Sequence, residues 1–169
     1  LAVGKRLTER GVSVKYARTD DTEKKLNDRT AESNAWGAQY YLSIHRNSAS
    51  PDATGNEIWV KSDATEKTVE KAAKILRAAC EADGLRNRGV KKGAPSYTDF
   101  AVNKYTKCAS GLLELGFITS TKDNAAWDRS FDKTADAIAK SLCEIVGVPW
   151  NKERRKGDVN GDGKVTTAD

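Results

Sequence analysis

The chain has 169 residues and a formal net charge of +5, with 38% hydrophobic and 31% charged residues. This composition predicts a packed domain and argues against general disorder, and no apolar run approaches the roughly 20 residues that span a bilayer. The basic charge suits a polyanionic partner, either nucleic acid or an anionic cell wall. Lys and Arg are dispersed, however, and are not interleaved with aromatic residues, which is weak support for nucleic acid.

The three cysteines form no C-x-x-C pair, so neither a zinc knuckle nor a disulfide framework is expected.

The first part of the chain predicts alternating helices and strands. Residues 1–10 have helical spacing that ends at Gly11, and they resemble the middle of a helix, so we expect the natural chain to extend before Leu1. Hydrophobic periodicity then predicts a strand over 12–18, a helix over 24–36, and strands over 40–44 and 56–60.

The second part contains the clearest helix, over 65–83, where Asp63 and Glu66 resemble a capping box. A buried strand is expected over 110–118 and a second long helix over 130–146. One face of that helix is expected to hold Phe131, Ala135, Ile138, Leu142 and Ile145. The order of elements predicts an α/β fold with a mixed, largely parallel, twisted sheet flanked by helices on both faces.

His45 is the only histidine and directly follows the predicted strand 40–44. A lone histidine is more often a hydrogen-bonded core residue than a ligand. The carboxyl ends of strands in α/β sheets gather functional groups, however, and this position favours a functional role. Ser43 and Asn47 flank the histidine. They are candidates for hydrogen bonds that orient its imidazole, and capping of the strand end is the equally plain alternative.

Glu114 lies inside the apolar stretch "GLLELGF". Burying a carboxylate is unfavourable unless it is paired, coordinated or protonated, so this position needs an explanation. An edge strand with the carboxylate facing solvent is one alternative, but the flanking residues are apolar on both faces. A buried carboxyl group with a shifted pKa is suited to act as a general base.

The two stretches that hold these residues, "SIHRNSA" (43–49) and "LLELGFIT" (112–119), resemble the paired signatures of zinc-dependent N-acetylmuramoyl-L-alanine amidases, which are cell-wall hydrolases of bacteria and their phages. The resemblance extends over residues 1–147. Further matching stretches occur in the family's order: "RGVSVKYARTDD" (10–21), "LNDRTAESN" (26–34), Gly55 with Glu57, and "GVKKG" (89–93).

The resemblance implies hydrolysis of the amide between N-acetylmuramic acid and the L-alanine of the stem peptide in peptidoglycan. It implies zinc as the cofactor, with His45 as one ligand and Glu114 as the catalytic acid/base. The family's other ligands, a histidine and a glutamate, are expected before Leu1. Residues 1–148 would then be an amidase domain that lacks its first strand and the start of its first helix.

The same resemblance implies a secreted or cell-wall location, or release by phage lysis. Arg18 and Arg29 are candidates for binding the substrate's carboxylates, although surface arginines are usually solvated. Trp59 is the best candidate among the four tryptophans for stacking on a sugar.

Residues 149–157 are expected to be a charged linker and residues 158–169 a separate element. The latter resembles the first half of a type I dockerin repeat with an EF-hand-like calcium loop, which implies calcium binding and a cohesin partner. The candidate calcium ligands are Asp158, Asn160, Asp162, Lys164, Thr166 and Asp169.

Two alternatives remain open at this stage. One is a non-catalytic cell-wall-binding module or an inactive fragment, because a single histidine cannot build the three-ligand site. The other is a basic nucleic-acid-binding α/β domain, which leaves Glu114 unexplained.

Overall fold

A computed structural model of the chain describes residues 1–150. The elements in chain order are α1 (Ala2–Glu9), α2 (Leu26–Trp36), β1 (Tyr40–Asn47), β2 (Asn56–Val60), α3 (Glu66–Asp83), β3 (Asn87–Lys92), α4 (Ala101–Lys104), β4 (Ala109–Phe117) and α5 (Thr121–Val146). The predicted calcium loop and most of the predicted linker lie outside the described residues.

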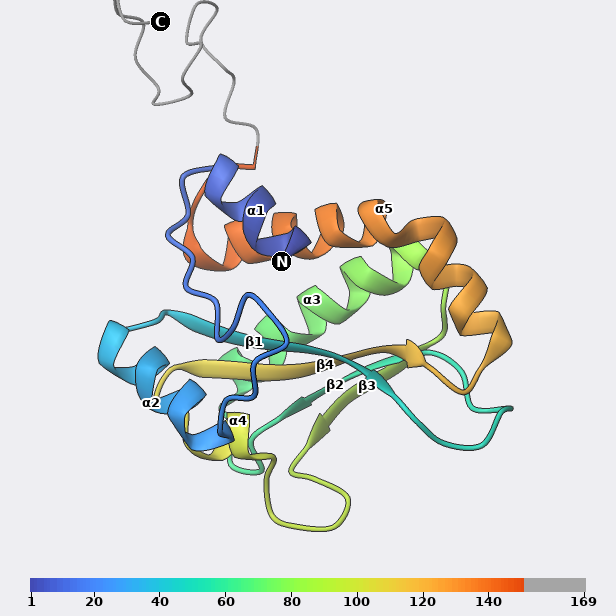
Figure 1. Cartoon of the computed structure of the whole chain (residues 1–169), viewed down its shortest axis with the longest axis horizontal. Helices are drawn as coiled ribbons and strands as arrows, with labels where there is room; N and C mark the ends of the chain where they lie inside the picture. The colour runs from blue at the N-terminus through green and yellow to red at the C-terminus, as the bar shows by residue number, and fades with distance from the viewer. Residues whose placement is uncertain (151–169) are drawn as a thin grey trace, which may run out of the picture.

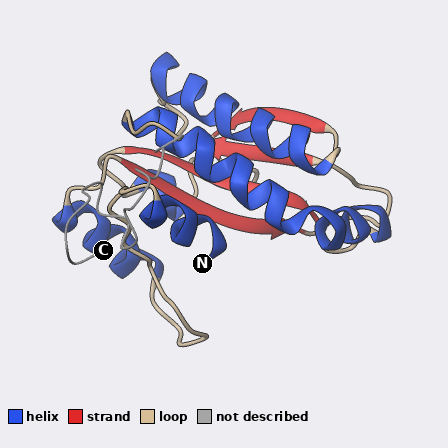
Figure 2. Cartoon of the chain, turned by 90° about the horizontal axis from the view of Figure 1, so that it is seen from above, coloured by secondary structure: helices blue, strands red, loops and turns tan. Residues whose placement is uncertain are grey.

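The four strands form one sheet in the order β1-β4-β2-β3. β1 pairs with β4 and β2 pairs with β3 in parallel, whereas β2 and β4 are antiparallel. Helices α1, α3 and α5 lie on one side of the sheet, and α2 and α4 lie on the other side, near the start of β1 and β4 (Figure 1). Viewed from above, the long helices lie over the sheet and run roughly along the strands (Figure 2). The predicted mixed, largely parallel sheet flanked by helices is thus confirmed.

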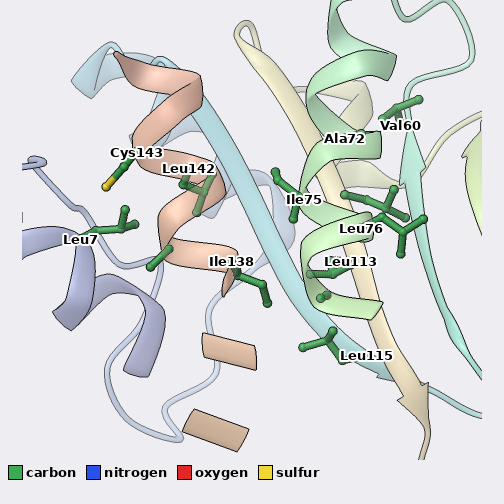
Figure 3. Close-up of a cluster of buried hydrophobic side chains, with 13 residues drawn as sticks. Leu7, Val60, Ala72, Ile75, Leu76, Leu113, Leu115, Ile138, Leu142 and Cys143 are labelled. Carbon is green, nitrogen blue, oxygen red and sulfur yellow. The ribbon is translucent and has the colours of Figure 1, made fainter. Parts of the chain in front are cut away.

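The hydrophobic core fills the space between the sheet and helices α1, α3 and α5 (Figure 3). Ile58 of β2 and Leu113 of β4 are register partners on this face, and neither side chain is exposed. Because successive side chains of a strand point to opposite faces, the residues next to these two point away from the core. The core thereby fixes which side chains line the opposite face of the sheet.

Both predicted limits of α3 are confirmed within one residue, whereas α5 confirms its predicted end and not its start. The N-cap of α3 is Thr65, whose hydroxyl accepts a hydrogen bond from the Thr68 amide, so the predicted capping box at Asp63 is wrong. Helix α5 begins at Thr121, well before residue 130, because its first turn is polar and its start is marked by a serine cap at Ser120 rather than by apolar spacing. Phe131 is 43% exposed and stacks edge-on against another aromatic ring, contrary to its predicted core position.

The strand predicted over 12–18 is absent from the structure. Val12 and Val14 still pack against the core, but from an irregular segment. A strand needs a neighbouring edge for its backbone hydrogen bonds, and within residues 1–150 β1 pairs only with β4. A cavity of about 1210 Å³ separates this segment from β1. The segment therefore makes no backbone hydrogen bonds of the strand type with β1.

The remaining differences concern strand limits. β1 continues to Asn47, so His45 lies inside the strand and not just beyond it. β3 was not predicted as a strand, since its sequence "NRGVKK" is charged and contains a glycine. None of the helices in the described part of the chain is long and apolar enough to cross a bilayer.

Candidate active site

Three adjacent strands place His45, Glu114 and Glu57 in one row across the sheet. Glu114 of β4 is the register partner of His45 on β1 and of Glu57 on β2. Directly opposed residues of paired strands point to the same face, with Cβ atoms about 5 Å apart. The row therefore lies on the face opposite the core, and it joins residues that are up to 69 positions apart in the chain.

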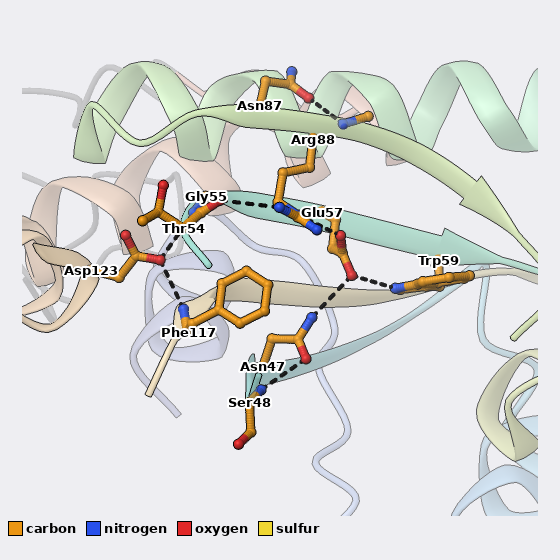
Figure 4. A network of polar contacts seen from close by, with 11 residues as sticks. Asn47, Ser48, Thr54, Gly55, Glu57, Trp59, Asn87, Arg88, Phe117 and Asp123 are labelled. Carbon is orange, nitrogen blue, oxygen red and sulfur yellow. Dashed lines mark hydrogen bonds and ion pairs between the residues drawn. The ribbon is translucent and has the colours of Figure 1, made fainter. Parts of the chain in front are cut away.

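Glu57 is a buried carboxylate with a full set of donors (Figure 4). Its Oε1 accepts hydrogen bonds from Asn47 Nδ2 and Trp59 Nε1, both at 3.0 Å. Its Oε2 accepts one from Arg88 Nε at 2.8 Å, which makes an ion pair. Arg88 also packs its guanidinium over the ring of Phe117, 5.0 Å from the centroid. These contacts fix the position of the Glu57 carboxylate.

Glu114 lies beside this charge without comparable partners. Its Oε2 is buried and has no hydrogen-bond partner within residues 1–150. Burial of the carboxyl group, followed by the negative charge of Glu57, raises the pKa of Glu114 from 4.5 to about 7. A carboxyl group with this pKa both accepts and releases a proton near neutral pH, which is what general acid–base catalysis requires.

His45 presents an imidazole on the exposed part of β1. Partial burial of the ring, and then the charges of Arg29 and Arg18, lower its pKa from 6.5. The two arginine charges disfavour the imidazolium and so act in the same direction as burial. The neutral imidazole is the form that binds zinc.

The described residues fit a catalytic zinc ion only in part. Within residues 1–150, no group of three or more His, Cys, Asp or Glu side chains has a metal-binding arrangement. Catalytic zinc takes three protein ligands and keeps one position for water. The predicted ligand His45 would be one of these three, and residues 1–150 do not provide the other two.

The other predicted site residues lie near the row but make different contacts from those expected. Asn47 bonds to Glu57 and to the Ser48 amide, and its predicted hydrogen bond to the His45 imidazole is not among the contacts of the described residues. Ser43 lies two residues before His45 and therefore on the same face of β1. Arg29 donates its Nε to the Lys24 carbonyl and lines the cavity beside β1 together with Arg18 and His45.

Three further residues of the site, Glu57, Arg88 and Asp123, have no role predicted from the sequence. The Asp123 carboxylate is fully buried and accepts hydrogen bonds from the Gly55 and Phe117 amides, which ties the loop before β2 to the end of β4. The signal that identified Glu114, a carboxylate within an apolar strand, is also present at Glu57 in "NEIWV". The local sequence did not indicate the partners Asn47 and Arg88, because they come from two other strands, β1 and β3.

Comparison with known proteins gives an indication that is independent of this geometry. Residues 1–144 match the N-acetylmuramoyl-L-alanine amidase family. The chain is 34% identical over 113 residues to the sporulation-specific N-acetylmuramoyl-L-alanine amidase of Bacillus subtilis (strain 168), covering 67% of this chain and 42% of that protein. It is 32% identical over 142 residues to the amidase LytC of the same organism, covering 80% of this chain and 27% of LytC. The chain thus spans less than half the length of these two relatives.

A solved structure has the same fold. The catalytic domain of CwlV, an N-acetylmuramoyl-L-alanine amidase from Bacillus (Paenibacillus) polymyxa var. colistinus, superposes with a TM-score of 0.77 at 27% sequence identity. The match covers 87% of this chain and 80% of that domain. The sheet and the helices that position the row are therefore shared with a cell-wall amidase.

Proposed function

This chain belongs to the N-acetylmuramoyl-L-alanine amidase family, and from that premise we propose that its site hydrolyses the amide between N-acetylmuramic acid and L-alanine in peptidoglycan. The observation that carries the proposal is Glu114, because its buried oxygen has no partner within residues 1–150 and its raised pKa suits a proton carrier. A nucleic-acid-binding role would leave this unfavourable carboxyl environment without a purpose.

In the proposed reaction, the Glu114 carboxylate takes a proton from the attacking water as the new C–O bond forms at the amide carbon. Glu114 then gives that proton to the leaving nitrogen as the C–N bond breaks. The products are a carboxylate on the muramic acid lactyl group and a free α-amine on L-alanine. The neighbouring Glu57 charge favours the protonated form of Glu114, which helps it act as the acid in the second half of the reaction.

We propose zinc as the cofactor, with His45 as a ligand and the others supplied by residues that precede Leu1 in a longer form of the protein. Bound zinc would acidify the water and polarise the scissile carbonyl. The neutral state favoured for the imidazole and its place beside Glu114 support this role for His45. Within residues 1–150 the second edge of β1 has no strand partner, so another strand that carries a ligand could pair there.

The test uses a longer form of the protein that includes residues before Leu1, incubated with purified peptidoglycan. We expect release of peptides with a free N-terminal L-alanine, near-stoichiometric zinc by elemental mass spectrometry, and loss of zinc on His45→Ala. Zinc that is unchanged by His45→Ala would remove His45 from the ligand set. Binding to peptidoglycan with no release of amino termini would favour the non-catalytic wall-binding module instead.

We also propose, from sequence alone, that residues 158–169 form a calcium loop that contributes to binding a cohesin. Carboxylate and amide oxygens at this spacing, with Gly163 at the turn, match calcium geometry. Calorimetric titration of the chain with calcium tests this, and we expect Asp158→Ala to abolish the binding heat. A role on peptidoglycan also requires a location outside the cytoplasm, either secreted, at the cell wall, or released by phage lysis.

A further inference from the structure

An aromatic cluster lies on the same face of the sheet as the catalytic row. Trp59 and Phe100 meet edge to face with their ring centroids 5.6 Å apart, and Tyr97 meets Phe100 in the same way at 6.0 Å. Tyr97 is 63% exposed, so the cluster reaches from the sheet surface to solvent. The proposed reaction uses none of these three rings.

The cluster is held rigidly. The Trp59 indole nitrogen is fixed by Glu57 at 3.0 Å, and the Lys91 ammonium lies 5.7 Å from the centre of the indole. The loop that carries the other two rings is anchored by Asp99, whose carboxylate accepts hydrogen bonds from the amide and the hydroxyl of Ser62. A rigid aromatic surface loses little conformational entropy when a ligand binds, which suits it for recognition.

The cluster lies close to Glu114 on the sheet. Trp59 follows Glu57 by two residues on β2, which corresponds to about 7 Å along the strand, and Glu57 is the register partner of Glu114. This spacing is comparable to the width of a pyranose ring. If the scissile amide lies beside Glu114, the sugar that carries it is therefore large enough to contact Trp59.

The opposite side of Glu114 has a different chemistry. Beside β1, Arg18 and Arg29 line the same cavity as His45. Guanidinium groups bind carboxylates, whereas aromatic rings pack against the C–H faces of sugars. The two sides of the site therefore match the two parts that an amidase of this family separates, a sugar and an acidic peptide.

We propose that Trp59, Phe100 and Tyr97 form the binding site for the amino sugar that carries the scissile amide, so that the glycan lies over β2 and β3 and the stem peptide lies on the β1 side. This assignment rests on the proposed amidase function. It fixes the direction in which the substrate crosses the sheet.

The test is an NMR titration of the 169-residue chain with a peptide-free N-acetylglucosaminyl–N-acetylmuramic acid disaccharide and, separately, with a free stem tetrapeptide. We expect Tyr97→Ala and Phe100→Ala to weaken disaccharide binding about threefold to tenfold, the usual range for one lost aromatic contact. Phe131→Ala, which removes an exposed aromatic ring on α5, is the matched control and should change nothing. Arg29→Ala should weaken tetrapeptide binding and leave the disaccharide unaffected.

Disaccharide binding that survives Tyr97→Ala and Phe100→Ala, or no disaccharide binding at millimolar concentration, would overturn the assignment. Tyr97 is exposed, so its replacement keeps the test valid even if Phe100→Ala does not fold. Hydrolysis of peptidoglycan by the longer form is measured separately. Hydrolysis without disaccharide binding would reject the sugar site alone, whereas disaccharide binding without hydrolysis would reject the proposed reaction.

Discussion

Glu57 and Glu114 are neighbours on the same face of the sheet, and their surroundings are opposite. Glu57 has an arginine partner and two further donors, and both of its oxygens are occupied. Glu114 has a buried oxygen with no partner within the described residues and a pKa raised to about 7. Register brings the two carboxyl groups together, and their partners alone distinguish them.

This difference separates a structural role from a chemical one. A carboxylate with matched donors stabilises the fold around it and is a poor proton carrier, because each donor favours the ionised form. A carboxyl group that is buried beside a fixed negative charge exchanges its proton near neutral pH. The charge of Glu57 thereby contributes, after burial, to the raised pKa of Glu114.

The largest expected effect is a loss of the rate of amide hydrolysis when Glu114 is replaced. In a hydrolytically active longer form, Glu114→Gln should lower the rate of amide hydrolysis by about 10³-fold, within the range for loss of a general acid–base group, while bound zinc is retained. The rate is measured as release of L-alanine amino termini and the zinc by elemental mass spectrometry. Retained hydrolysis in Glu114→Gln would remove Glu114 from its proposed role.

The next effect tests the structural role of Glu57. Arg88→Ala leaves the Glu57 carboxylate, which is only 4% exposed at its side chain, without its cation. Removing one partner of such a pair should cost about 3 kcal/mol of unfolding free energy. Urea unfolding at pH 7 measures this loss. A change below about 1 kcal/mol, the range for exposed pairs, would mean that the pair is solvent-screened.

A pH-dependent effect tests Glu114 in the chain itself. Its folded pKa of about 7 lies above the ordinary value of 4.5, so the folded state keeps its proton where the unfolded state has lost it. Stability should therefore fall as pH rises from about 4.5 to 7 and stay level above that range. Glu114→Gln removes this dependence and should be more stable than the wild type by about 2 kcal/mol at pH 8, once partial exposure is allowed for.

Urea unfolding of both forms in EDTA at pH 4.5 and pH 8 measures this difference. At pH 4.5 the two forms should have nearly equal stability, because the wild-type carboxyl is then largely protonated. A stability difference that is the same at both pH values would show that Glu114 titrates normally.

The smallest effect is expected at a surface ion pair. Lys74 and Glu144 link α3 to α5 at 2.8 Å, but their side chains are 51% and 45% exposed. Lys74→Ala should therefore change the unfolding free energy by less than about 0.5 kcal/mol. A loss as large as that of Arg88→Ala would contradict the distinction between buried and solvated charges.

Periodicity and residue chemistry predicted much of this molecule. Helix α3 and strands β1, β2 and β4 follow from apolar spacing, and His45 and Glu114 stood out because their residue types are unusual where they occur. These signals are local. The strand order and the pairing of Glu57 with Arg88 depend on contacts between distant segments, which local patterns do not encode.

The strand predicted over 12–18 is wrong for the same reason, since a local pattern does not show whether a pairing partner exists. Its alternating residues satisfy the local pattern, but strand formation depends on an available edge, which is a non-local condition. Among the described residues, β1 offers its second edge only across a cavity.

The most direct test of the account is the titration of the Glu114 carboxyl carbon by NMR in the ¹³C-glutamate-labelled, metal-free chain. Its signal is assigned by comparison with Glu114→Gln. We predict a midpoint near pH 7, which moves to lower pH in Glu57→Gln because the neighbouring charge is removed. A midpoint near the ordinary value of 4.5 would contradict the claim that its surroundings make Glu114 the proton carrier.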